Sequence, residues 1–293
     1  MKHHVWIRAL SAWVTGLLFL GVILPGAAEI HVGQEPPAEW AEKEVLRLTA
    51  FATLINDCTL MEVGGKSMLI DGGVRKWREK LTEALTEMGY GERVNIIYNT
   101  HPHDDHLQNV TQMMKHGFRA DEFWSSFRPD YRNDTQRSAV RELEKAGIPY
   151  HQLAQGETVN FGGAELSFYW WEEGGDPNAR SSIMHVTFGD ATVLMTGDAT
   201  GAAQQGILKV LSGDQLKADI MKMPHHGLVR IVQDFLATVD PGFIFVTNRK
   251  SGSPKATEQM KAAKIPFYNT TGGRVVMVTD GTDWYITQYA DMF

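Results

Sequence analysis

Two short segments contain five of the eleven histidines of this 293-residue chain. Residues 100–106 have the sequence THPHDDH, and residues 225–227 have the sequence HHG. Capping of a following helix would explain one aspartate in the first segment, but not three imidazoles within six residues. Closely spaced His and Asp side chains are typical of metal sites. The sequence therefore predicts a metal centre.

The spacing within the first segment predicts two adjacent metal positions. An extended strand has a side-chain period of two residues, so His101 and His103 would lie on the same side and bind one ion together. If a helix starting near Leu107 turns the chain, Asp105 and His106 point towards a second position. One short loop would then supply ligands for two ions.

Two further aspartates, Asp71 and Asp198, also follow apolar strand-like runs. Either carboxylate has an alternative role as a helix cap. Asp71 is equally suited to accept a hydrogen bond from the second nitrogen of a ligand imidazole. Because each candidate group follows a strand, we expect these strand ends to converge on one edge of the core.

The elements that must position these groups alternate between strands and helices. Strands are predicted at 46–51, 59–63, 67–70, 94–98, 158–161, 164–171, 185–188, 192–196, 219–223, 242–247, 275–279 and 284–287, and helices at 74–88, 107–114, 137–145, 204–211, 229–237 and 257–263. Strand clusters mixed with helices in both halves predict an α/β protein with helix-covered sheets and no linker between the halves.

The composition is that of a globular chain, with 43% hydrophobic and 22% charged residues. The 28 Lys and Arg residues are outnumbered by 35 Asp and Glu residues, a formal charge of −7. No strong nucleic-acid binding is therefore expected. The single cysteine, Cys58, excludes an internal disulfide and any zinc site built from several thiolates, so a metal must use His and carboxylate ligands.

The first 28 residues have the charge and apolar pattern of a leader sequence, unlike the rest of the chain. Lys2 and Arg8 precede an apolar run from residue 9 to 24, and small residues follow it, which predicts a cleaved signal peptide over 1–28 and an exported protein. An uncleaved membrane anchor is the alternative, whereas cleavage leaves no stable membrane span. Residues 29–45 form a polar segment, and 46–293 form one domain.

Together these motifs resemble the metallo-β-lactamase fold superfamily. Asp71, His-x-His-x-Asp-His at 101–106, Thr-Gly-Asp at 196–198 and His-His-Gly at 225–227 stand in that family's order and approximate spacing. The resemblance extends from about Leu46 to the carboxyl terminus. It is strongest to the branch that contains the terminal hydrolase-like domain of the competence DNA-uptake protein and secreted phosphorylcholine esterases. It implies a four-layer αββα sandwich of two mixed β-sheets with a dinuclear zinc site at one edge.

The resemblance also implies a role for each motif residue. The implied metal ligands are His101, His103, Asp105, His106, Asp198 and His226. Asp198 would bridge the two ions. His226 is preferred over His225 because it directly precedes the glycine, which leaves His225 as a contact to substrate or leaving group.

Two departures from the family pattern limit the resemblance. Many members have a further metal-binding histidine before the bridging aspartate, where this chain has residues 178–182 with the sequence NARSS. His185 is the nearest substitute, but its strand setting predicts a core or cross-strand residue. The DNA-uptake branch usually has a histidine where this chain has Ser253, which argues against a nuclease.

A dinuclear site of this kind predicts hydrolysis by zinc-bound hydroxide, with Asp105, His225 and Asp71 as the protein groups around it. The expected substrate is a phosphodiester or phosphate ester outside the cytoplasm, on a small molecule or an anionic cell surface. The donor set also admits Mn²⁺ or Fe. The first alternative is a carbonyl substrate such as a β-lactam, lactone or thioester. The second is a noncatalytic zinc-binding protein associated with uptake.

Aromatic and basic residues on segments near the predicted site are candidates for substrate contacts. They are Phe123, Trp124, Phe127, Tyr131, Trp170 and Trp171, with Arg128, Arg132 and Arg180. An aromatic cage could hold a quaternary ammonium group and the arginines a phosphate. Core packing is the alternative for the aromatic residues. No pattern in the sequence marks an oligomer interface.

Overall fold

The computed structural model describes residues 28–53, 56–248, 253–291 and 293. Apart from Ala28, the predicted signal peptide lies outside these residues. Within the described ranges, no helix has both the length and the apolar character needed to cross a membrane.

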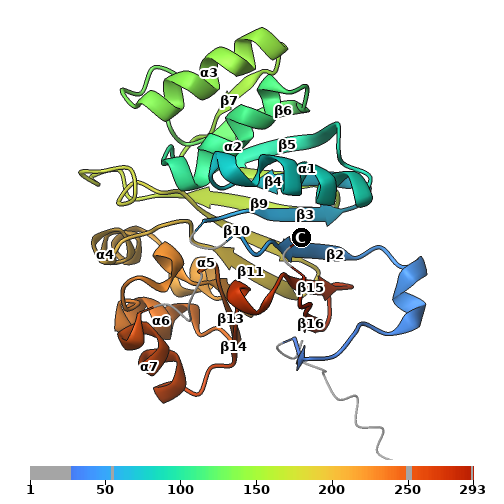
Figure 1. The fold of residues 1–293 in the computed structure, drawn as a ribbon. Helices are drawn as coiled ribbons and strands as arrows, with labels where there is room; N and C mark the ends of the chain where they lie inside the picture. The colour runs from blue at the N-terminus through green and yellow to red at the C-terminus, as the bar shows by residue number, and fades with distance from the viewer. Residues whose placement is uncertain (1–27, 54–55, 249–252, 292) are drawn as a thin grey trace, which may run out of the picture.

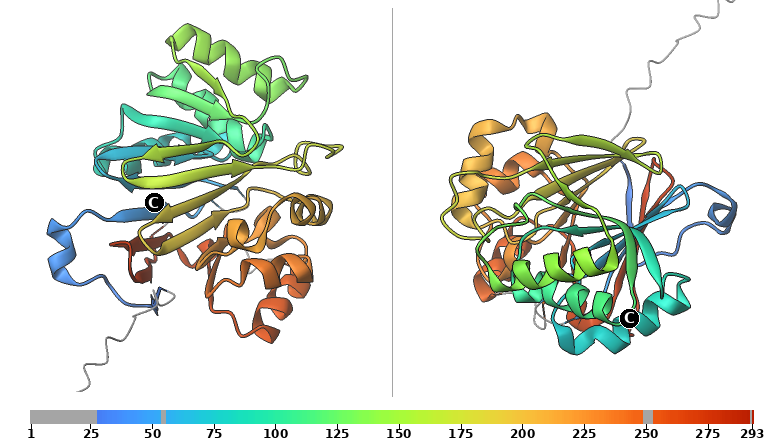
Figure 2. Two further views of the ribbon diagram at one scale, coloured as in Figure 1. Left: turned by 180° about the vertical axis from the view of Figure 1, so that it is seen from behind. Right: turned by 90° about the horizontal axis from the view of Figure 1, so that it is seen from above.

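Two mixed β-sheets face each other and form the centre of the molecule (Figures 1 and 2). The nine-stranded sheet has the order β1-β16-β15-β2-β3-β4-β5-β6-β7. Its strands are β1 Ile30–Val32, β2 Leu46–Ala50, β3 Thr59–Val63, β4 Lys66–Ile70, β5 Arg93–Asn99, β6 Arg119–Ser125, β7 Tyr150–Gln152, β15 Val275–Thr279 and β16 Trp284–Gln288. The seven-stranded sheet has the order β14-β13-β12-β11-β10-β9-β8. Its strands are β8 Thr158–Phe161, β9 Ala164–Tyr169, β10 Ile183–Phe188, β11 Ala191–Met195, β12 Ile220–Lys222, β13 Phe243–Val246 and β14 Phe267–Asn269.

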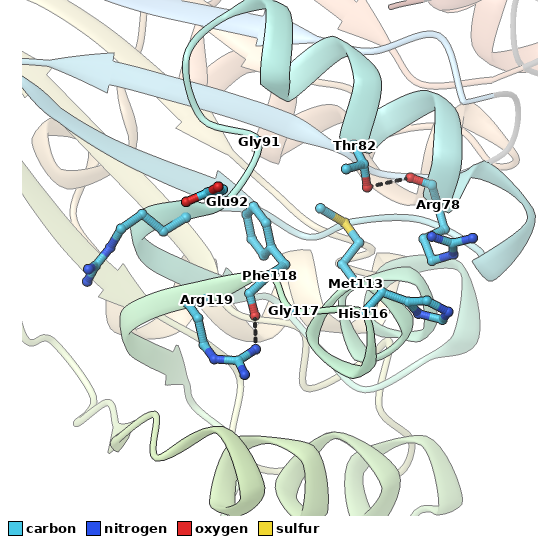
Figure 3. A pocket seen from close by; sticks show the side chains of 10 residues that line it. Arg78, Thr82, Gly91, Glu92, Met113, His116, Gly117, Phe118 and Arg119 are labelled. Carbon is cyan, nitrogen blue, oxygen red and sulfur yellow. Dashed lines mark hydrogen bonds between the residues drawn. The ribbon is translucent and has the colours of Figure 1, made fainter.

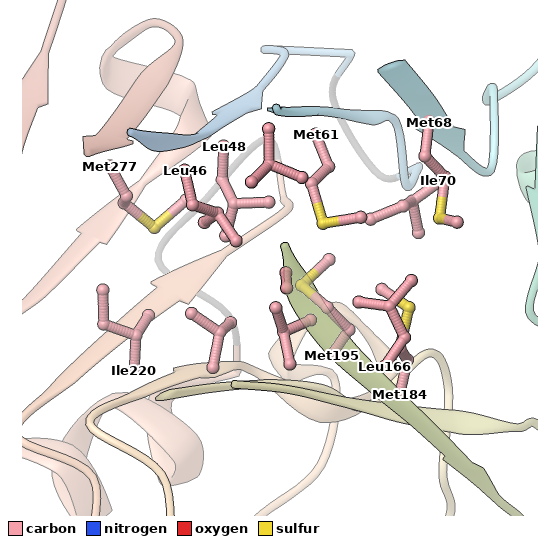
Figure 4. Close-up of a cluster of buried hydrophobic side chains, with 14 of the residues drawn as sticks. Leu46, Leu48, Met61, Met68, Ile70, Leu166, Met184, Met195, Ile220 and Met277 are labelled. Carbon is pink, nitrogen blue, oxygen red and sulfur yellow. The ribbon is translucent and has the colours of Figure 1, made fainter. Parts of the chain in front are cut away.

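The main core fills the space between the two sheets. Leu48 and Met61 point inwards from the nine-stranded sheet, and Leu166 and Met184 point inwards from the other (Figure 4). Five methionines contribute to this layer: Met61, Met68, Met184, Met195 and Met277. Unbranched methionine side chains fill irregular gaps well, which suits the space between two twisted sheets.

Helices cover the outer face of each sheet (Figure 1). The helices are α1 Arg78–Glu87, α2 Asp104–Lys115, α3 Asp134–Ala146, α4 Gly201–Val210, α5 Gly213–Leu216, α6 Gln233–Val239 and α7 Pro254–Ala262, with short 3₁₀ turns at Ala38–Glu42, Arg75–Trp77, Pro224–Gly227 and Thr270–Gly272. Helices α1 to α3 bury apolar residues against the nine-stranded sheet, and α4, α6 and α7 do so against the other. The predicted αββα sandwich is therefore confirmed.

The parallel strands of both sheets deliver their carboxyl ends to one edge. Strands β4, β5 and β6 run parallel in one sheet, and β11, β12 and β13 run parallel in the other. Every motif predicted to carry chemistry follows one of these strands. This arrangement lets residues that are far apart in the sequence form one site.

Several elements differ from the predictions. Helix α2 begins at Asp104 instead of Leu107, and α6 begins at Gln233 instead of Val229. Strands β6, β7 and β14 and helix α5 were not predicted, because they are very short or, in β6, carry charged residues. Strand β1 lies within the predicted polar segment 29–45 and pairs in parallel with β16 at the sheet edge.

Candidate metal centre

Three buried imidazoles converge on one carboxylate. The Nε2 atoms of His106 and His226 lie 3.4 and 3.2 Å from Oδ2 of Asp198, and that of His101 lies 4.0 Å from it. These residues follow three different strands, β5, β12 and β11. All four side chains are at most 3% exposed to solvent. The structure thus brings together histidines from both sequence clusters around the predicted bridging aspartate.

The facing atoms lack hydrogen-bond partners within the described part of the chain. His106 Nε2 and His226 Nε2, which face Asp198 Oδ2, are buried without one, and so is the other carboxylate oxygen, Asp198 Oδ1. Leaving a buried polar atom unsatisfied costs about 1–3 kcal/mol, so two such nitrogens directed at one carboxylate need a physical reason. A divalent cation accepts imidazole nitrogen and carboxylate oxygen as ligands. The residues present therefore fit a metal ion at this position.

Asp71 supports the first cluster from behind. Its Oδ2 lies 2.7 Å from His106 Nδ1, and its two oxygens also accept hydrogen bonds from the Asn99 side chain and from both the amide and the hydroxyl of Thr100. None of these contacts caps a helix. Asp71 has the geometry expected of an acceptor that fixes the orientation of His106.

His103 and Asp105 line the more open side of the cluster. His103 Nδ1 is 3.1 Å from His101 Nε2, and Asp105 Oδ2 is 3.4 Å from His226 Nε2. Asp105 and His106 lie in the first turn of α2, so the helix itself directs their side chains. All six residues predicted as ligands therefore lie in one cluster.

The two adjacent histidines of the second motif differ in position. His226 is buried, whereas the side chain of His225 is 25% exposed. His225 Nε2 is 3.9 Å from Asp198 Oδ2 and 3.4 Å from the Asn178 side-chain nitrogen. His226 is therefore placed inside the cluster and His225 at its rim. Both have a left-handed backbone conformation, with φ of 49° and 52°. Residues other than glycine rarely adopt this conformation.

Ser181 lies within residues 178–182, the region in which the family pattern often has a further histidine. Its hydroxyl is 3.4 Å from His101 Nδ1 and accepts a hydrogen bond from the Asp198 amide. Asp198 does not cap α4, because Thr200 occupies that position and accepts from Ala203 N. His185 lies in β10, where its Nε2 is 2.9 Å from the Lys217 carbonyl, which places it outside the cluster.

Two residues at the centre were missed by sequence reasoning. Asp57 Oδ1 lies 3.2 Å from His226 Nδ1, and Lys222 Nζ lies 2.7 Å from Asp57 Oδ2. Both side chains are nearly inaccessible to solvent. Nothing around Asp57 marks it in the sequence. Lys222 did offer a signal, because a lysine at the end of an apolar strand directly before the second histidine motif needs a buried partner.

The carboxylates and imidazoles shift one another's protonation strongly. Burial lowers the pKa of His106 and His226, but nearby carboxylates outweigh it and hold both pKa values well above the usual range. Burial raises the pKa of Asp105, but the close contact with His226 and the charge of His106 lower it to about 2. Burial lowers the pKa of His101 far below normal. Carboxylates that favour protonated imidazoles also provide a field that attracts a metal cation.

Core packing, and not an aromatic cage, accounts for most of the aromatic residues near the site, as the sequence led us to expect. Phe123 and Trp124 are buried in β6, where they pack in the two core layers on either side of the sheet. The guanidinium carbon of Arg180 lies 5.6 Å from the ring centre of Phe127 and 6.0 Å from that of Tyr131. Arg180 thus occupies the aromatic faces that an ammonium ligand would need.

One surface cavity of about 450 Å³ lies elsewhere (Figure 3). It is lined by Arg78, Arg93, His116 and Arg119, among others. Arg93 and Arg119 are the first residues of β5 and β6, whereas the cluster follows the ends of the parallel strands. Strands of this length separate the two places by about 20 Å. The cavity is therefore not part of the candidate centre.

Comparisons with known proteins identify the family and the fold of the chain. The model of the family described as the metallo-beta-lactamase superfamily matches residues 53–247. The fold is similar to that of the metallo-beta-lactamase fold protein YhfI from Bacillus subtilis, with 12% identity, a TM-score of 0.55, and coverage of 81% of this chain and 100% of that one. It is also similar to CmlA, a diiron beta-hydroxylase from Streptomyces venezuelae, with 13% identity, a TM-score of 0.52, and coverage of 83% and 55%.

A third similar structure is a diphosphatase from the PhnP family, with 13% identity, a TM-score of 0.50, and coverage of 80% of this chain and 98% of that one. At such low identities these likenesses establish the fold alone. No curated protein sequence matches the chain.

Proposed function

The chain belongs to the metallo-β-lactamase superfamily, and from this premise we propose that it is an exported hydrolase that uses two divalent metal ions to cleave a phosphodiester or phosphate ester. The observation that carries the proposal is the convergence of His101, His106 and His226 on Asp198. Export is proposed from the leader-like sequence of residues 1–28.

Each ion has a proposed set of ligands in this cluster. His101 and His103 would hold one ion, Asp105 and His106 the other, with Asp198 between them and His226 completing the set. Such ions supply a hydroxide nucleophile near neutral pH and stabilise developing negative charge as Lewis acids.

Zinc is the proposed metal because nitrogen and oxygen donors suit it and redox chemistry is not required. Mn²⁺ or Fe would fit the same donors. The similarity to a diiron enzyme supports keeping iron among them. The only cysteine, Cys58, is buried in the core under α1 and α2 and is no part of the donor set.

Arg180 supports an anionic substrate. Within the described part of the chain, its Nε is buried without a hydrogen-bond partner. Arg180 directly precedes Ser181, whose hydroxyl lies 3.4 Å from His101 Nδ1, so its backbone lies next to a residue of the centre. A fixed guanidinium binds phosphate oxygens in a bidentate manner. The similarity to a diphosphatase points to the same substrate class.

His225 and Asn178 are further proposed substrate contacts. Both are half-buried at the rim, with their side-chain nitrogens 3.4 Å apart. Either side chain can form a hydrogen bond to an oxygen of the substrate or leaving group without leaving its place.

The test combines elemental analysis with two chromogenic substrates. The protein lacking residues 1–28 should contain about two zinc ions and hydrolyse bis-p-nitrophenyl phosphate but not nitrocefin. Arg180→Gln should raise KM about tenfold and leave kcat nearly unchanged, because a charged hydrogen bond contributes about 1.5–3 kcal/mol. Arg128→Gln is the matched control, since Arg128 is exposed and paired with Asp130.

Each other outcome contradicts a stated part of the proposal. Turnover of nitrocefin alone would replace the phosphoester by a carbonyl substrate. Two bound ions without turnover of either compound would indicate a noncatalytic metal-binding protein. A chain that binds no metal would refute the mechanism itself.

A further inference from the structure

Two buried carboxylates lie behind two of the three buried imidazoles of the centre. Asp71 lies 2.7 Å from Nδ1 of His106, and Asp57 lies 3.2 Å from Nδ1 of His226. We propose that Asp57, held by Lys222, is a positioning residue that orients His226 towards its metal ion, as Asp71 orients His106. The inference rests on the proposed metal centre but not on the identity of its substrate.

The geometry places Asp57 outside the ligand set. Oxygen and nitrogen atoms of Asp57, His106, Asp198 and His226 lie within 4.8 Å of one another, which by distance alone would allow all four to share an ion. The two nitrogens of an imidazole, however, point in diverging directions. Asp198 faces Nε2 of both rings, whereas Asp57 faces Nδ1 of both, at 3.2 Å from His226 and 3.8 Å from His106. A metal ion held at Nε2 is therefore out of reach of Asp57.

Thr247, which follows β13, completes the support. Its hydroxyl donates a hydrogen bond to Asp57 Oδ1, and its oxygen lies 3.2 Å from His226 Nδ1. With the hydroxyl proton directed to Asp57, the oxygen can accept only from an Nδ1–H group of the ring. That places the ring proton on Nδ1 and leaves the Nε2 lone pair directed at the cluster. This is the tautomer a metal ligand needs.

Lys222 ties Asp57 to the segments on which the ligands lie. Its Nζ is 2.7 Å from Asp57 Oδ2 and donates to the carbonyls of Gly197 and Met223, at 2.8 and 3.2 Å. Gly197 directly precedes Asp198, and Met223 precedes the turn that contains His226. A single ammonium group thus connects Asp57 to the backbone before Asp198 and before His226. Charge pairing of this kind is costly to break when both groups are buried.

The test measures zinc affinity by competition with a chromophoric chelator, in the protein lacking residues 1–28. Asp57→Asn should weaken binding of one zinc ion about 10- to 100-fold, the range expected when the outer partner of a ligand imidazole is removed. The other ion should bind as in wild type. Asp71→Asn should weaken binding through His106 to a similar degree. His226→Ala provides the reference for complete loss of that ligand.

Asp219→Asn is the matched control, because Asp219 also accepts backbone and side-chain hydrogen bonds but contacts Thr192 and Trp284 instead of the centre. It should bind two zinc ions with wild-type affinity. The visible spectrum of the cobalt-substituted protein gives a second readout, since a tilted His226 ring changes the ligand field in Asp57→Asn but not in Asp219→Asn.

Two further variants keep the inference testable if Asp57→Asn does not fold. Thr247→Val removes the hydroxyl that joins Asp57 to His226. It should weaken binding of the same zinc ion, by a smaller factor than Asp57→Asn does. Lys222→Met leaves Asp57 as an unpaired buried charge. The Lys222→Met protein should therefore bind zinc more weakly than the Asp57→Asn/Lys222→Met double variant, which has no such charge.

The outcomes separate this inference from the proposed function. Unchanged affinity for both ions in Asp57→Asn and Thr247→Val would overturn it while leaving the metal centre intact. A loss in Asp57→Asn as complete as in His226→Ala would make Asp57 a direct ligand, which also overturns it. Wild-type protein that binds no zinc would refute the proposed function itself.

Discussion

The two histidine segments reach the same point by different structural means. His106 lies in the first turn of α2, a regular helix whose first turn also contains Asp104 and Asp105. Acidic residues there are favourable because the amino end of a helix carries partial positive charge. His226 instead follows a three-residue strand, in a turn with two successive non-glycine residues in the left-handed region.

This difference shows what fixes the geometry of each half of the site: the half around His106 and the half around His226. A helix fixes the directions of its own side chains by local hydrogen bonds, so the first segment needs few outside contacts. Left-handed residues cost about 1–3 kcal/mol each, so the second turn persists only if its surroundings hold it in place. Lys222, Thr247 and Gly197 supply those contacts. The backbone around His106 is thus set largely by its own helix, although Asp71 orients the ring from outside, whereas the backbone of the second turn depends on tertiary packing.

The largest expected effect comes from the group that both halves share. Asp198→Asn removes the charge on which the three Nε2 atoms converge. Both ions should therefore bind more weakly, and the total metal content should fall below one ion per chain. Phosphodiester hydrolysis should drop at least about a thousandfold, because Lewis-acid stabilisation contributes several kcal/mol and each 1.4 kcal/mol is a factor of ten.

Elemental analysis and initial rates measure both effects. Asp121→Asn, which removes an exposed partner of Arg93, serves as the control. A variant that keeps one tightly bound ion would show that the two halves act independently, contrary to the shared role given to Asp198.

A smaller effect, confined to the half of the site around His226, is expected from a substitution at Gly197. Gly197 has φ of 48°, and a Cβ atom added there would meet Ser181 Oγ and lie 3.0 Å from Thr100 Cβ. Gly197→Ala should therefore lower the free energy of unfolding by about 1–3 kcal/mol. It should also weaken binding of the zinc ion that has His226 as a ligand, since the Gly197 carbonyl accepts a hydrogen bond from Lys222.

Denaturant unfolding and zinc competition check this prediction. Gly65→Ala is the matched control, because Gly65 also has a positive φ of 70° but nothing lies within 4 Å of its added Cβ. It should show the backbone strain alone and no change in metal affinity. Equal losses in the two variants would contradict the dependence of the second half on packing.

The smallest expected effect tests the independence of the first half. Asp104 accepts a hydrogen bond from Thr135 at the start of α3 and contributes negative charge to the first turn of α2. Asp104→Ala should cost about 0.3–1 kcal/mol of stability, a shift of a few degrees in Tm. Zinc affinity should stay at the wild-type value. A clear loss of metal would show that the first half also relies on contacts outside its helix.

Much of this site was predictable because its residues are concentrated in short motifs. The loop 101–106 was identified from residue type and spacing alone, and the helix that follows it was expected, although its start at Asp104 was placed three residues late. Strands that carry Asp71, Asp198 and His226 were also expected, since apolar runs before polar residues mark buried strand ends. These features depend on neighbours within a few residues.

Asp57 and Lys222 were not predictable in the same way. They are separated by 165 positions, and each is a single charged residue in an apolar neighbourhood, so no local pattern links them. The surroundings of Arg180 were likewise not predictable, because the rings nearest its guanidinium, those of Phe127 and Tyr131, lie far from it in the sequence. Short strands such as β7 and β14 form only because a longer neighbour pairs with them.

The sequence by itself determined the donor types, their order and the layered fold, because side-chain chemistry and hydrophobic period are local properties of the chain. Only the tertiary structure decided which atoms face one another: Asp198 towards three Nε2 atoms, Asp71 and Asp57 towards Nδ1, and His225 at the rim. The physical reason is that these contacts join the ends of strands from two sheets, and their directions are set by how the sheets pack.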